Sequence, residues 1–353
     1  INFYEIYYPS MDHRITNTHF HHSFAQNVNT EDTWGPYQYK FITNSLGFKD
    51  KSNRKIAKKN NMKRIIFIGD SFTEGIGYEY EDTFVGLIEE KFKQINTEVL
   101  NAGVASQSPT IYYLKIKFLI EELKITFDEL IIFLDISDVP DEIYYQDYYN
   151  NLFLENNYLI KIEKKIGIFL TKNFSSILFY NVISEQLNHI KKNLILRYKA
   201  SKEFKKSFFN IKKAEVSYYK SITVERGNWT HEEDLWKIHG QKGRKIAEQN
   251  LKKLLNLCIN NNIKMSLVIY PWPSQIHYNL NPLNHRVYWN DWAVSNNINF
   301  YDFFNYFDSN NKKHLIKKFF IDGDIHWNSN GHKYISSIFI EEYQKKNNYI
   351  IID

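Results

Sequence analysis

The chain has 353 residues, of which 43% are hydrophobic and 17% aromatic, so it can bury a large core as one large domain or as one domain with a substantial insertion. Its 45 basic and 40 acidic residues give a net charge of +5, which is too mild to indicate a nucleic-acid partner. The single cysteine, Cys258, excludes an intrachain disulfide and is expected to be a buried apolar residue rather than a nucleophile or a ligand.

The chain begins with Ile1 instead of Met, and removal of a signal peptide or membrane anchor is the commonest cause of such a start. We therefore expect an extracytoplasmic location, whether periplasmic, secreted or anchored through a removed segment. The stretch that comes nearest to a membrane span, residues 166–183, is interrupted by polar residues such as Lys172 and Asn181. It predicts a buried or amphipathic helix, with a role at a membrane surface as the alternative.

Residues 1–62 show no regular hydrophobic period and are predicted to form an N-terminal extension packed on the main domain. They contain His13, His19, His21 and His22. The last three could bind a metal ion, but no matching cysteine or carboxylate pattern accompanies them. Surface histidines are the favoured interpretation, and no metal site is expected.

From residue 63 onward, short apolar runs alternate with helical patterns, which predicts a parallel sheet with helices on both faces. The predicted strands cover residues 64–68, 98–100, 130–134 and 265–270 and a short run that reaches Tyr301, and the predicted helices cover residues 83–92, 109–123 and 240–261 and the segment after Ser329. Residues 140–235 break this rhythm and predict a mainly helical insertion at the edge where the strands end. The main domain would thus span residues 63–353.

Polar residues gather where the predicted strands end. Gly69-Asp70-Ser71 follows the first strand, Asn101-Ala102-Gly103 the second and Asp135–Asp138 the third, while Asp324–His326 precedes the last helix. In open α/β sheets, ligand sites lie at the carboxyl ends of the strands, so these four segments are expected to converge.

Ser71, His326 and Asp324 are the residue types that nucleophilic attack on an acyl group requires. A serine hydroxyl is a poor nucleophile near neutral pH, so a histidine must accept its proton during the attack, and a carboxylate must orient that histidine. The pattern therefore predicts chemistry on acyl esters. The alternatives are a helix N-cap for Ser71 and a structural histidine beside a helix start, a role we assign to His332.

These segments resemble the four sequence blocks of the SGNH hydrolases, also called the GDSL esterase/lipase family. The Gly-Asp-Ser tripeptide matches the block that holds the nucleophile, Gly103 the second block, Asp135–Asp138 the third and Asp324–His326 the fourth. The resemblance covers residues 63–139 and 240–345 approximately. It implies a three-layer α/β/α fold of flavodoxin-like type, an acyl-enzyme intermediate, and neither a metal nor an organic cofactor.

The resemblance also implies an oxyanion hole formed by the backbone N–H groups of Ser71 and Gly103. The family's third donor is an asparagine side chain, and Ser137 occupies its position, which puts that donor in question. Losing one such donor can cost roughly 2.7 to 4 kcal/mol of transition-state stabilisation.

The fourth block departs from the usual Asp-x-x-His spacing, because here only one residue separates Asp324 from His326, and Trp327 follows. This Asp-x-His-Trp segment is similar to that of the SGNH-like domains in exopolysaccharide O-acetyltransferases, such as those of alginate. It implies that Asp324 is the triad acid, with Asp322 as a second candidate.

Four further residues are candidates for the cleft: Asp70, Gln107, Trp272 and Trp327. The tryptophan rings could stack on sugar rings. We expect Asp70 to cap or orient the turn around the serine and not to act as a base. Trp289 and Trp292 are three positions apart and are interpreted as core residues on one helix face.

The predicted function is a serine-dependent O-acyl ester hydrolase or acyltransferase that acts on O-acetyl groups of a cell-surface or secreted carbohydrate. The expected partners are an acylated carbohydrate or other ester substrate and, by analogy with polysaccharide acetylation systems, a membrane acyl-transfer partner. A lipase-like esterase of small or lipid esters is one alternative. A catalytically inactive SGNH-fold carbohydrate-binding or scaffold protein is the other, favoured by the unusual third block.

Overall fold

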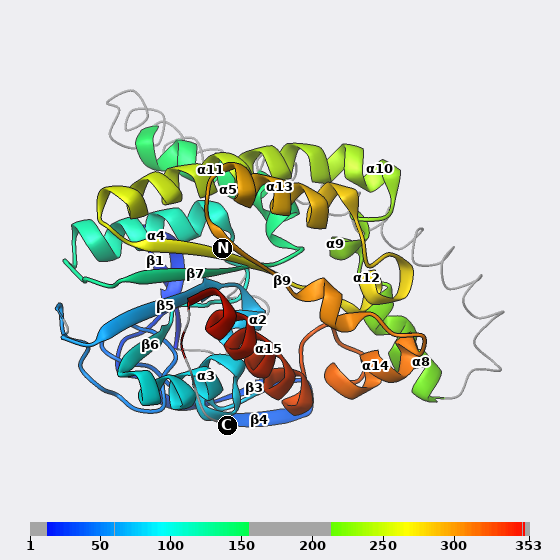
Figure 1. Ribbon diagram of the computed structural model, residues 1–353, viewed down its shortest axis with the longest axis horizontal. Helices are drawn as coiled ribbons and strands as arrows, with labels where there is room; N and C mark the ends of the chain where they lie inside the picture. The colour runs from blue at the N-terminus through cyan, green and yellow to red at the C-terminus, as the bar shows by residue number, and fades with distance from the viewer. Residues whose placement is uncertain (1–12, 60, 155–212, 348, 350–353) are drawn as a thin grey trace, which may run out of the picture. The chain divides into compact units, whose positions relative to one another are not determined.

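The computed structural model describes residues 13–59, 61–154, 213–347 and 349 (Figure 1). The chain divides into two compact units, residues 1–146 together with 218–353, and residues 147–217. The first unit carries the main sheet and all of the candidate site residues.

The main sheet has five parallel strands in the order β6-β5-β7-β8-β9. The strands are β5 (Lys63–Gly69), β6 (Thr97–Asn101), β7 (Glu129–Leu134), β8 (Lys264–Ile269) and β9 (Asn299–Asp302). They are almost continuously buried runs, as expected for strands that are covered on both faces. The order is the flavodoxin-like one, and it places the topological switch point between β5 and β7, where such folds bind their ligands.

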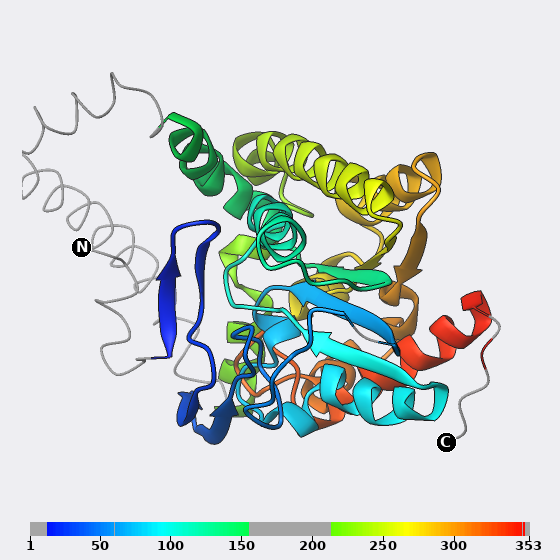
Figure 2. The ribbon, with the colours of Figure 1, turned by 90° about the vertical axis from the view of Figure 1, so that its left-hand side faces the viewer.

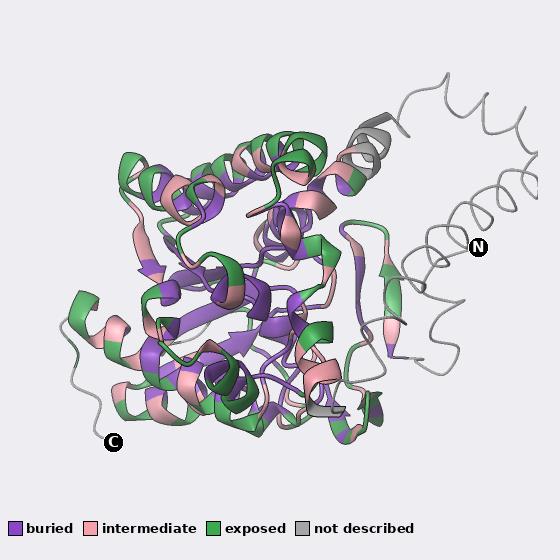
Figure 3. Cartoon of the chain, turned by 90° about the vertical axis from the view of Figure 1, so that its right-hand side faces the viewer, coloured by how far each residue is buried: buried purple, intermediate pink, exposed green. Residues whose placement is uncertain are grey.

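Helices cover both faces of this sheet, which confirms the predicted three-layer α/β/α architecture (Figure 1). The helices α3 (Phe84–Phe92) and α15 (Ser329–Asn347) lie on one face, and α4 (Pro109–Glu121), α11 (Gln241–Asn260) and α13 (Tyr288–Ser295) lie on the other. Figure 3 shows that the strands are buried along their length and that the outer faces of the helices are exposed.

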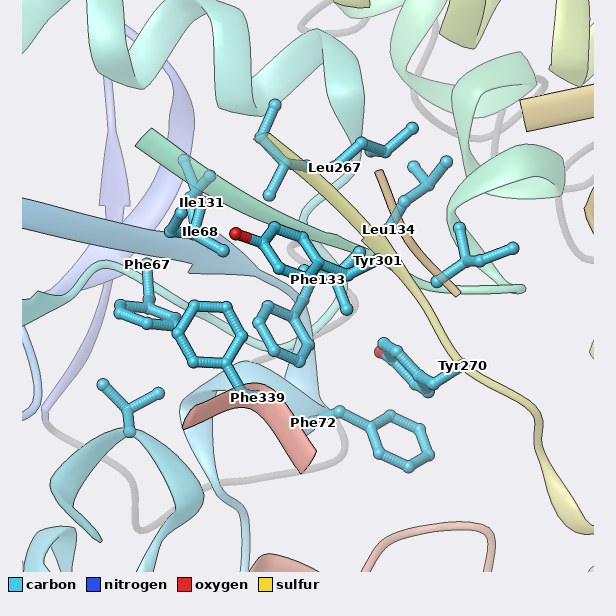
Figure 4. Packing of buried hydrophobic residues seen from close by; sticks show 14 of the residues in the cluster. Phe67, Ile68, Phe72, Ile131, Phe133, Leu134, Leu267, Tyr270, Tyr301 and Phe339 are labelled. Carbon is cyan, nitrogen blue, oxygen red and sulfur yellow. The ribbon is translucent and has the colours of Figure 1, made fainter. Parts of the chain in front are cut away.

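Aromatic rings fill the space between the sheet and α15, as Figure 4 shows. Phe67 of β5 meets Phe339 of α15 edge to face at 5.1 Å between ring centroids, and Phe133 of β7 lies 6.1 Å from the same ring. Phe72 and Tyr270, 5.1 Å apart, continue this packing beyond the strand ends toward the candidate site. The core therefore supports the site directly from below.

The N-terminal segment forms two antiparallel hairpins, which the sequence analysis did not predict. They are β1 (Arg14–Asn17) with β2 (His21–Phe24), and β3 (Asn29–Trp34) with β4 (Tyr37–Ile42). Trp34 pairs with Tyr37 across a two-residue turn in which Gly35 has φ +55°, a conformation that glycine adopts without strain. In Figure 2 these dark-blue strands lie on the side where β5 and β6 end.

The surface interpretation of the N-terminal histidines is right for His19 and wrong for His13 and His22, which are both buried. His13 hydrogen-bonds Asp32 at 3.2 Å, and His22 hydrogen-bonds the carbonyl oxygen of Ala105 at 2.9 Å. Burial lowers the pKa of His22 to about 3, so this imidazole is neutral and serves as a tie between the extension and the main domain.

The described parts of the predicted insertion are helical. Its helices are α5 (Asp138–Leu154), α8 (Lys213–Ile222), α9 (Glu225–Asn228) and α10 (Glu233–Leu235). Residues 155–212 lie outside the described residues, and with them the helix predicted at residues 166–183. No helix in the described part of the chain combines the length and hydrophobicity needed to cross a bilayer.

The remaining described elements are short helical segments around the sheet. They are α2 (Ser71–Glu74), η1 (Tyr80–Asp82), η2 (Lys93–Ile95), η3 (Trp236–Gly240), α12 (Pro273–Tyr278), η4 (Leu283–Val287), η5 (Phe303–Phe307) and α14 (Lys312–Phe319).

Candidate active site

Ser71 occupies the first position of the short helix α2, directly after the end of β5. The N-cap of this helix is Asp70, whose carboxylate accepts the N–H of Phe72 at 2.9 Å. The alternative role of Ser71 as the N-cap is therefore filled by its neighbour. The turn is tight, because a Cβ at Gly69 would come within 2.8 Å of the carbonyl oxygen of Phe133.

Ser71, His326 and Asp324 form a continuous chain of hydrogen bonds. The Oγ of Ser71 lies 2.8 Å from Nε2 of His326, and Nδ1 of His326 lies 2.7 Å from Oδ1 of Asp324. With a proton on Nδ1, His326 donates to the Asp324 carboxylate, which leaves Nε2 as an acceptor for the hydroxyl proton of Ser71. Ser71 is partly exposed and His326 is buried, so the hydroxyl can be reached from solvent while the imidazole is held in place.

A tight turn before α15 presents His326 to the serine. The N–H of Asp324 donates to the carbonyl oxygen of Ile321 at 3.0 Å. The N–H of Ile321 donates to the carbonyl oxygen of His326 at 2.8 Å. Trp327 anchors the turn from beneath, 99% buried, with its ring centroid 4.8 Å from that of Phe72. The hydrogen-bonded turn, packed on the buried indole of Trp327, thus brings Asp324 and His326 into contact although only one residue separates them.

Asp324, and not Asp322, is the carboxylate that contacts the histidine. Asp322 is exposed, whereas Oδ1 of Asp324 accepts from Nδ1 of His326 and from the N–H groups of Ile325 and His326. Burial alone would raise the pKa of Asp324, but the hydrogen bonds and charge of His326 outweigh it and lower this pKa to about 2. The carboxylate is therefore ionised throughout the neutral range.

Two of the three predicted oxyanion donors are engaged elsewhere. The N–H of Gly103 donates to Oδ1 of Asn101 at 3.0 Å, and Ser137 donates both its N–H and its hydroxyl to Oδ1 of Asp135 at 2.7 Å. An oxyanion would have to compete with these acceptors. The N–H of Ser71 lies at the first position of a helix, where the backbone leaves donors unpaired, so it is the clearest remaining donor.

Three buried carboxylates, Asp70, Asp135 and Asp138, lie behind the nucleophile with one oxygen of each within 4.8 Å of the others. This is the group of side chains among the described residues that comes nearest to a metal-ligand set. Asp135 already accepts from Ser137 and from the indole of Trp272 at 2.7 Å, and Oδ2 of Asp70 lies 3.1 Å from Oγ of Ser71. We interpret the group as a hydrogen-bonded network that supports the serine turn.

Burial raises the pKa of Asp70 and of Asp138 well above their usual range, and the neighbouring carboxylates add to the effect. One oxygen of Asp138 has no hydrogen-bond partner among the described residues. A proton on this oxygen would relieve both the burial of charge and the repulsion between carboxylates. The network is therefore expected to take up a proton at a higher pH than a solvent-exposed aspartate does.

The Asp138→Asn variant should show a weaker loss of stability with rising pH than the wild type. A carboxyl whose pKa is raised by folding stabilises the native state at low pH, and this contribution is lost as the pH rises toward the native pKa. The amide cannot ionise, so the free energy of unfolding should fall less between about pH 5 and pH 9 than in the wild type. Urea unfolding at about pH 5 and pH 9 measures this difference, and parallel pH curves for the two proteins would contradict it.

The predicted cleft residues Asp70, Gln107, Trp272 and Trp327 are all buried, so the structure does not support a cleft role for them. Trp272 donates to Asp135 and Gln107 donates to the carbonyl oxygen of His22 at 2.8 Å. Each side chain turns inward because its polar atoms or its ring complete contacts within the core. No sugar ring could stack on these indoles without rearrangement.

Sequence reasoning missed two contributions from the N-terminal hairpins. The indole N–H of Trp34 donates to Oδ2 of Asp324 at 2.9 Å, and the guanidinium of Arg14 binds the buried carboxylate of Glu74 at the end of α2 at 2.5 and 3.1 Å. The buried Glu74 also accepts the N–H of Ala105 at 2.8 Å. A glutamate within the apolar segment after the serine was the one available signal, because a buried carboxylate requires a partner.

No protein-family model matches the chain, and no curated protein matches it in sequence. Several solved structures are similar to it at low identity. A GDSL-like lipase from Bacteroides thetaiotaomicron is 14% identical, with 82% of this chain and 93% of that chain covered at a TM-score of 0.38. A psychrotrophic esterase from a Pseudoalteromonas species is 10% identical, with 81% of this chain and 100% of that chain covered at a TM-score of 0.42.

An acetyl xylan esterase is 15% identical, with 79% of this chain and 98% of that chain covered at a TM-score of 0.40. At these levels we draw the fold and the chemistry from the residues of this chain alone. The order of its four sequence blocks, its flavodoxin-like sheet and its Ser71–His326–Asp324 chain resemble the pattern of the SGNH, or GDSL, hydrolases.

Proposed function

We propose that the protein is a serine-dependent O-acyl ester hydrolase or acyltransferase. The observation that carries the proposal is the hydrogen-bonded chain from Ser71 through His326 to Asp324. The inactive scaffold is a weaker alternative, because a degenerate site has no need to keep a partly exposed serine in contact with an oriented imidazole.

The first step forms an acyl-enzyme. Oγ of Ser71 attacks the acyl carbon while its proton passes to Nε2 of His326, and the imidazolium then gives this proton to the departing alkoxide as the ester bond breaks. Asp324 keeps Nδ1 protonated and stabilises the imidazolium by its charge. The N–H of Ser71 donates to the oxyanion of the tetrahedral intermediate.

The second step releases the acyl group. Water attacks the acyl carbon, its proton passes to Nε2 of His326, and collapse of the second tetrahedral intermediate breaks the bond to Oγ and returns the proton to Ser71. The products are a carboxylic acid and free enzyme. A sugar hydroxyl in place of water gives acyl transfer with the same residues in the same roles.

We further propose that the acyl group is acetyl and that its carrier is an extracytoplasmic carbohydrate. The support for this is the Asp324-Ile325-His326-Trp327 segment, which resembles that of polysaccharide O-acetyltransferases. The burial of Trp272 and Trp327 removes the support that stacking on sugar rings had offered. A carbohydrate would therefore be bound by other groups near Ser71.

Covalent labelling tests the proposed nucleophile. A fluorophosphonate probe should modify the wild-type protein at one position, and peptide mass mapping should place the label on Ser71. Ser71→Ala should remain unlabelled, and Ser137→Ala, which changes a serine at the neighbouring strand end, should retain the label. A wild-type protein without label on Ser71 would contradict the proposal.

Release of acetate tests the substrate. The protein is assayed with the p-nitrophenyl esters of acetate, butyrate and octanoate and with an O-acetylated xylo-oligosaccharide. Each assay is run in the presence and in the absence of an unacetylated oligosaccharide. We expect the acetyl ester to be the best chromogenic substrate and to give acetate, or acetylated acceptor in the transfer case. A preference for octanoate by about tenfold or more would favour the lipase-like alternative.

A further inference from the structure

Trp34 reaches the triad from the tip of an N-terminal hairpin, 290 positions before Asp324 in the chain. Its Nε1–H donates to Oδ2 of Asp324 at 2.9 Å, and its ring meets the imidazole of His326 edge to face at 5.1 Å between centroids. The catalytic chain of hydrogen bonds therefore has a fourth member, contributed by the extension and not by the α/β domain.

The two oxygens of Asp324 have different partners. Oδ1 accepts the N–H groups of Ile325 and His326 and Nδ1 of His326, whereas Oδ2 accepts from Trp34. Hydrogen bonds on both oxygens prevent rotation of the carboxylate about its Cβ–Cγ bond, because rotation would break bonds on both sides. The orientation of His326 then depends on a donor outside the fourth sequence block.

The hairpin itself is tied to the helix that carries the nucleophile. Asp32, two residues before Trp34, is buried and accepts from His13 at 3.2 Å, from Arg14 at 3.3 Å and from the hydroxyl of Tyr39 at 2.9 Å. Arg14 in turn binds Glu74 of α2. One set of buried bonds thus links the Ser71 helix to the hairpin, and the hairpin links back to Asp324.

We propose that Trp34 is a positioning residue of the active site and that the N-terminal hairpin is a built-in part of the catalytic apparatus. Trp34 acts through Asp324: it holds the carboxylate that orients His326, and it touches no reacting atom. This inference rests on the proposed serine-hydrolase function for its kinetic consequence, while the contact itself can be tested without any substrate.

The spectroscopic test uses the indole N–H resonances of the 15N-labelled protein. Trp34→Phe identifies the resonance of Trp34, which should respond to Asp324→Asn because the amide accepts more weakly than the carboxylate. The resonance of Trp236, a partly buried tryptophan that packs against Trp229 and Arg244, serves as the internal control and should stay unchanged. An unmoved Trp34 resonance in Asp324→Asn would overturn the inference.

The kinetic test compares Trp34→Phe with Trp236→Phe and with Trp34→Gln, which restores a donor without the ring. Trp34→Phe should lower kcat for p-nitrophenyl acetate and the rate of fluorophosphonate labelling by roughly 10- to 100-fold, the range for one hydrogen bond to a charged group, with KM nearly unchanged. Trp34→Gln should recover part of this loss. Equal rates for Trp34→Phe and Trp236→Phe would overturn the positioning role.

The two tests separate this inference from the proposed function. A wild-type protein that neither hydrolyses esters nor takes the label would refute the proposed function, and the response of the Trp34 resonance would then decide the inference alone. Thermal unfolding of each variant verifies that a lost rate does not come from a lost fold.

Discussion

Ser71→Ala is expected to lower kcat/KM for p-nitrophenyl acetate by at least about a thousandfold while leaving the protein folded. The side chain of Ser71 supplies the only bond to the acyl group in the proposed mechanism, and its removal leaves oxyanion stabilisation and binding alone. His326→Ala should cost a similar factor, because the serine then has no base at 2.8 Å. Stopped-flow or plate kinetics over about four decades of rate measures both effects.

The combined Ser71→Ala/His326→Ala variant should be no slower than either single variant. Residues that act as one unit do not contribute additively, since the second change removes nothing that still functions. Asp324→Asn should reduce the rate strongly, and Asp322→Asn, two positions away and exposed, is the matched control that should leave it unchanged. Additive losses in the double variant, or equal effects of the two aspartate changes, would contradict the triad.

Glu74→Ala is expected to lower the free energy of unfolding by about 3–5 kcal/mol. Glu74 is fully buried and pairs with Arg14, and its removal leaves the guanidinium with only the longer contact to Asp32 at 3.3 Å in a region of low dielectric. The change also removes the acceptor for the N–H of Ala105. Urea unfolding followed by circular dichroism measures the loss, and the exposed Glu81→Ala should stay within about 0.5 kcal/mol of the wild type.

The Arg14→Met/Glu74→Met variant should be more stable than the sum of its single changes predicts. Arg14→Met leaves the buried Glu74 carboxylate without its cation, and Glu74→Met leaves Arg14 with Asp32 alone. The double change removes both groups, so a coupling of about 1–3 kcal/mol is expected. Strict additivity would mean that the two side chains do not depend on each other, contrary to their bidentate contact.

The α/β core could be predicted from the sequence because its signals are local. Buried parallel strands appear as uninterrupted apolar runs such as residues 64–68, and glycine, polar residues or proline mark where these runs end. The Asp-x-His pair lies within one turn, so its geometry also follows from adjacent residues. Ser71 and His326 could be paired because both were expected at the same edge of the sheet.

The rest of the site depends on contacts that have no local signature. Nothing near Trp34 in the sequence indicates that its indole will meet Asp324. Of the two strands of its hairpin, β3 lacks a hydrophobic alternation, whereas β4 alternates over residues 37–41 and was a signal that the sequence analysis did not use. The orientation of side chains at strand ends was equally hidden. Trp272 and Ser137 both donate to Asp135, because a buried carboxylate requires hydrogen-bond donors to offset its desolvation.

The length of chain between the site residues sets the order in which the protein gains its function during synthesis. The bond between Ser71 and His326 spans 255 positions, and the bond between Trp34 and Asp324 spans 290. Ribosomes release a chain from its N-terminus, so the hairpin and Ser71 emerge long before His326. In the proposed mechanism a nascent chain therefore carries an unactivated hydroxyl, and reactivity of Ser71 toward a fluorophosphonate is expected to report that the two distant parts of the chain have met.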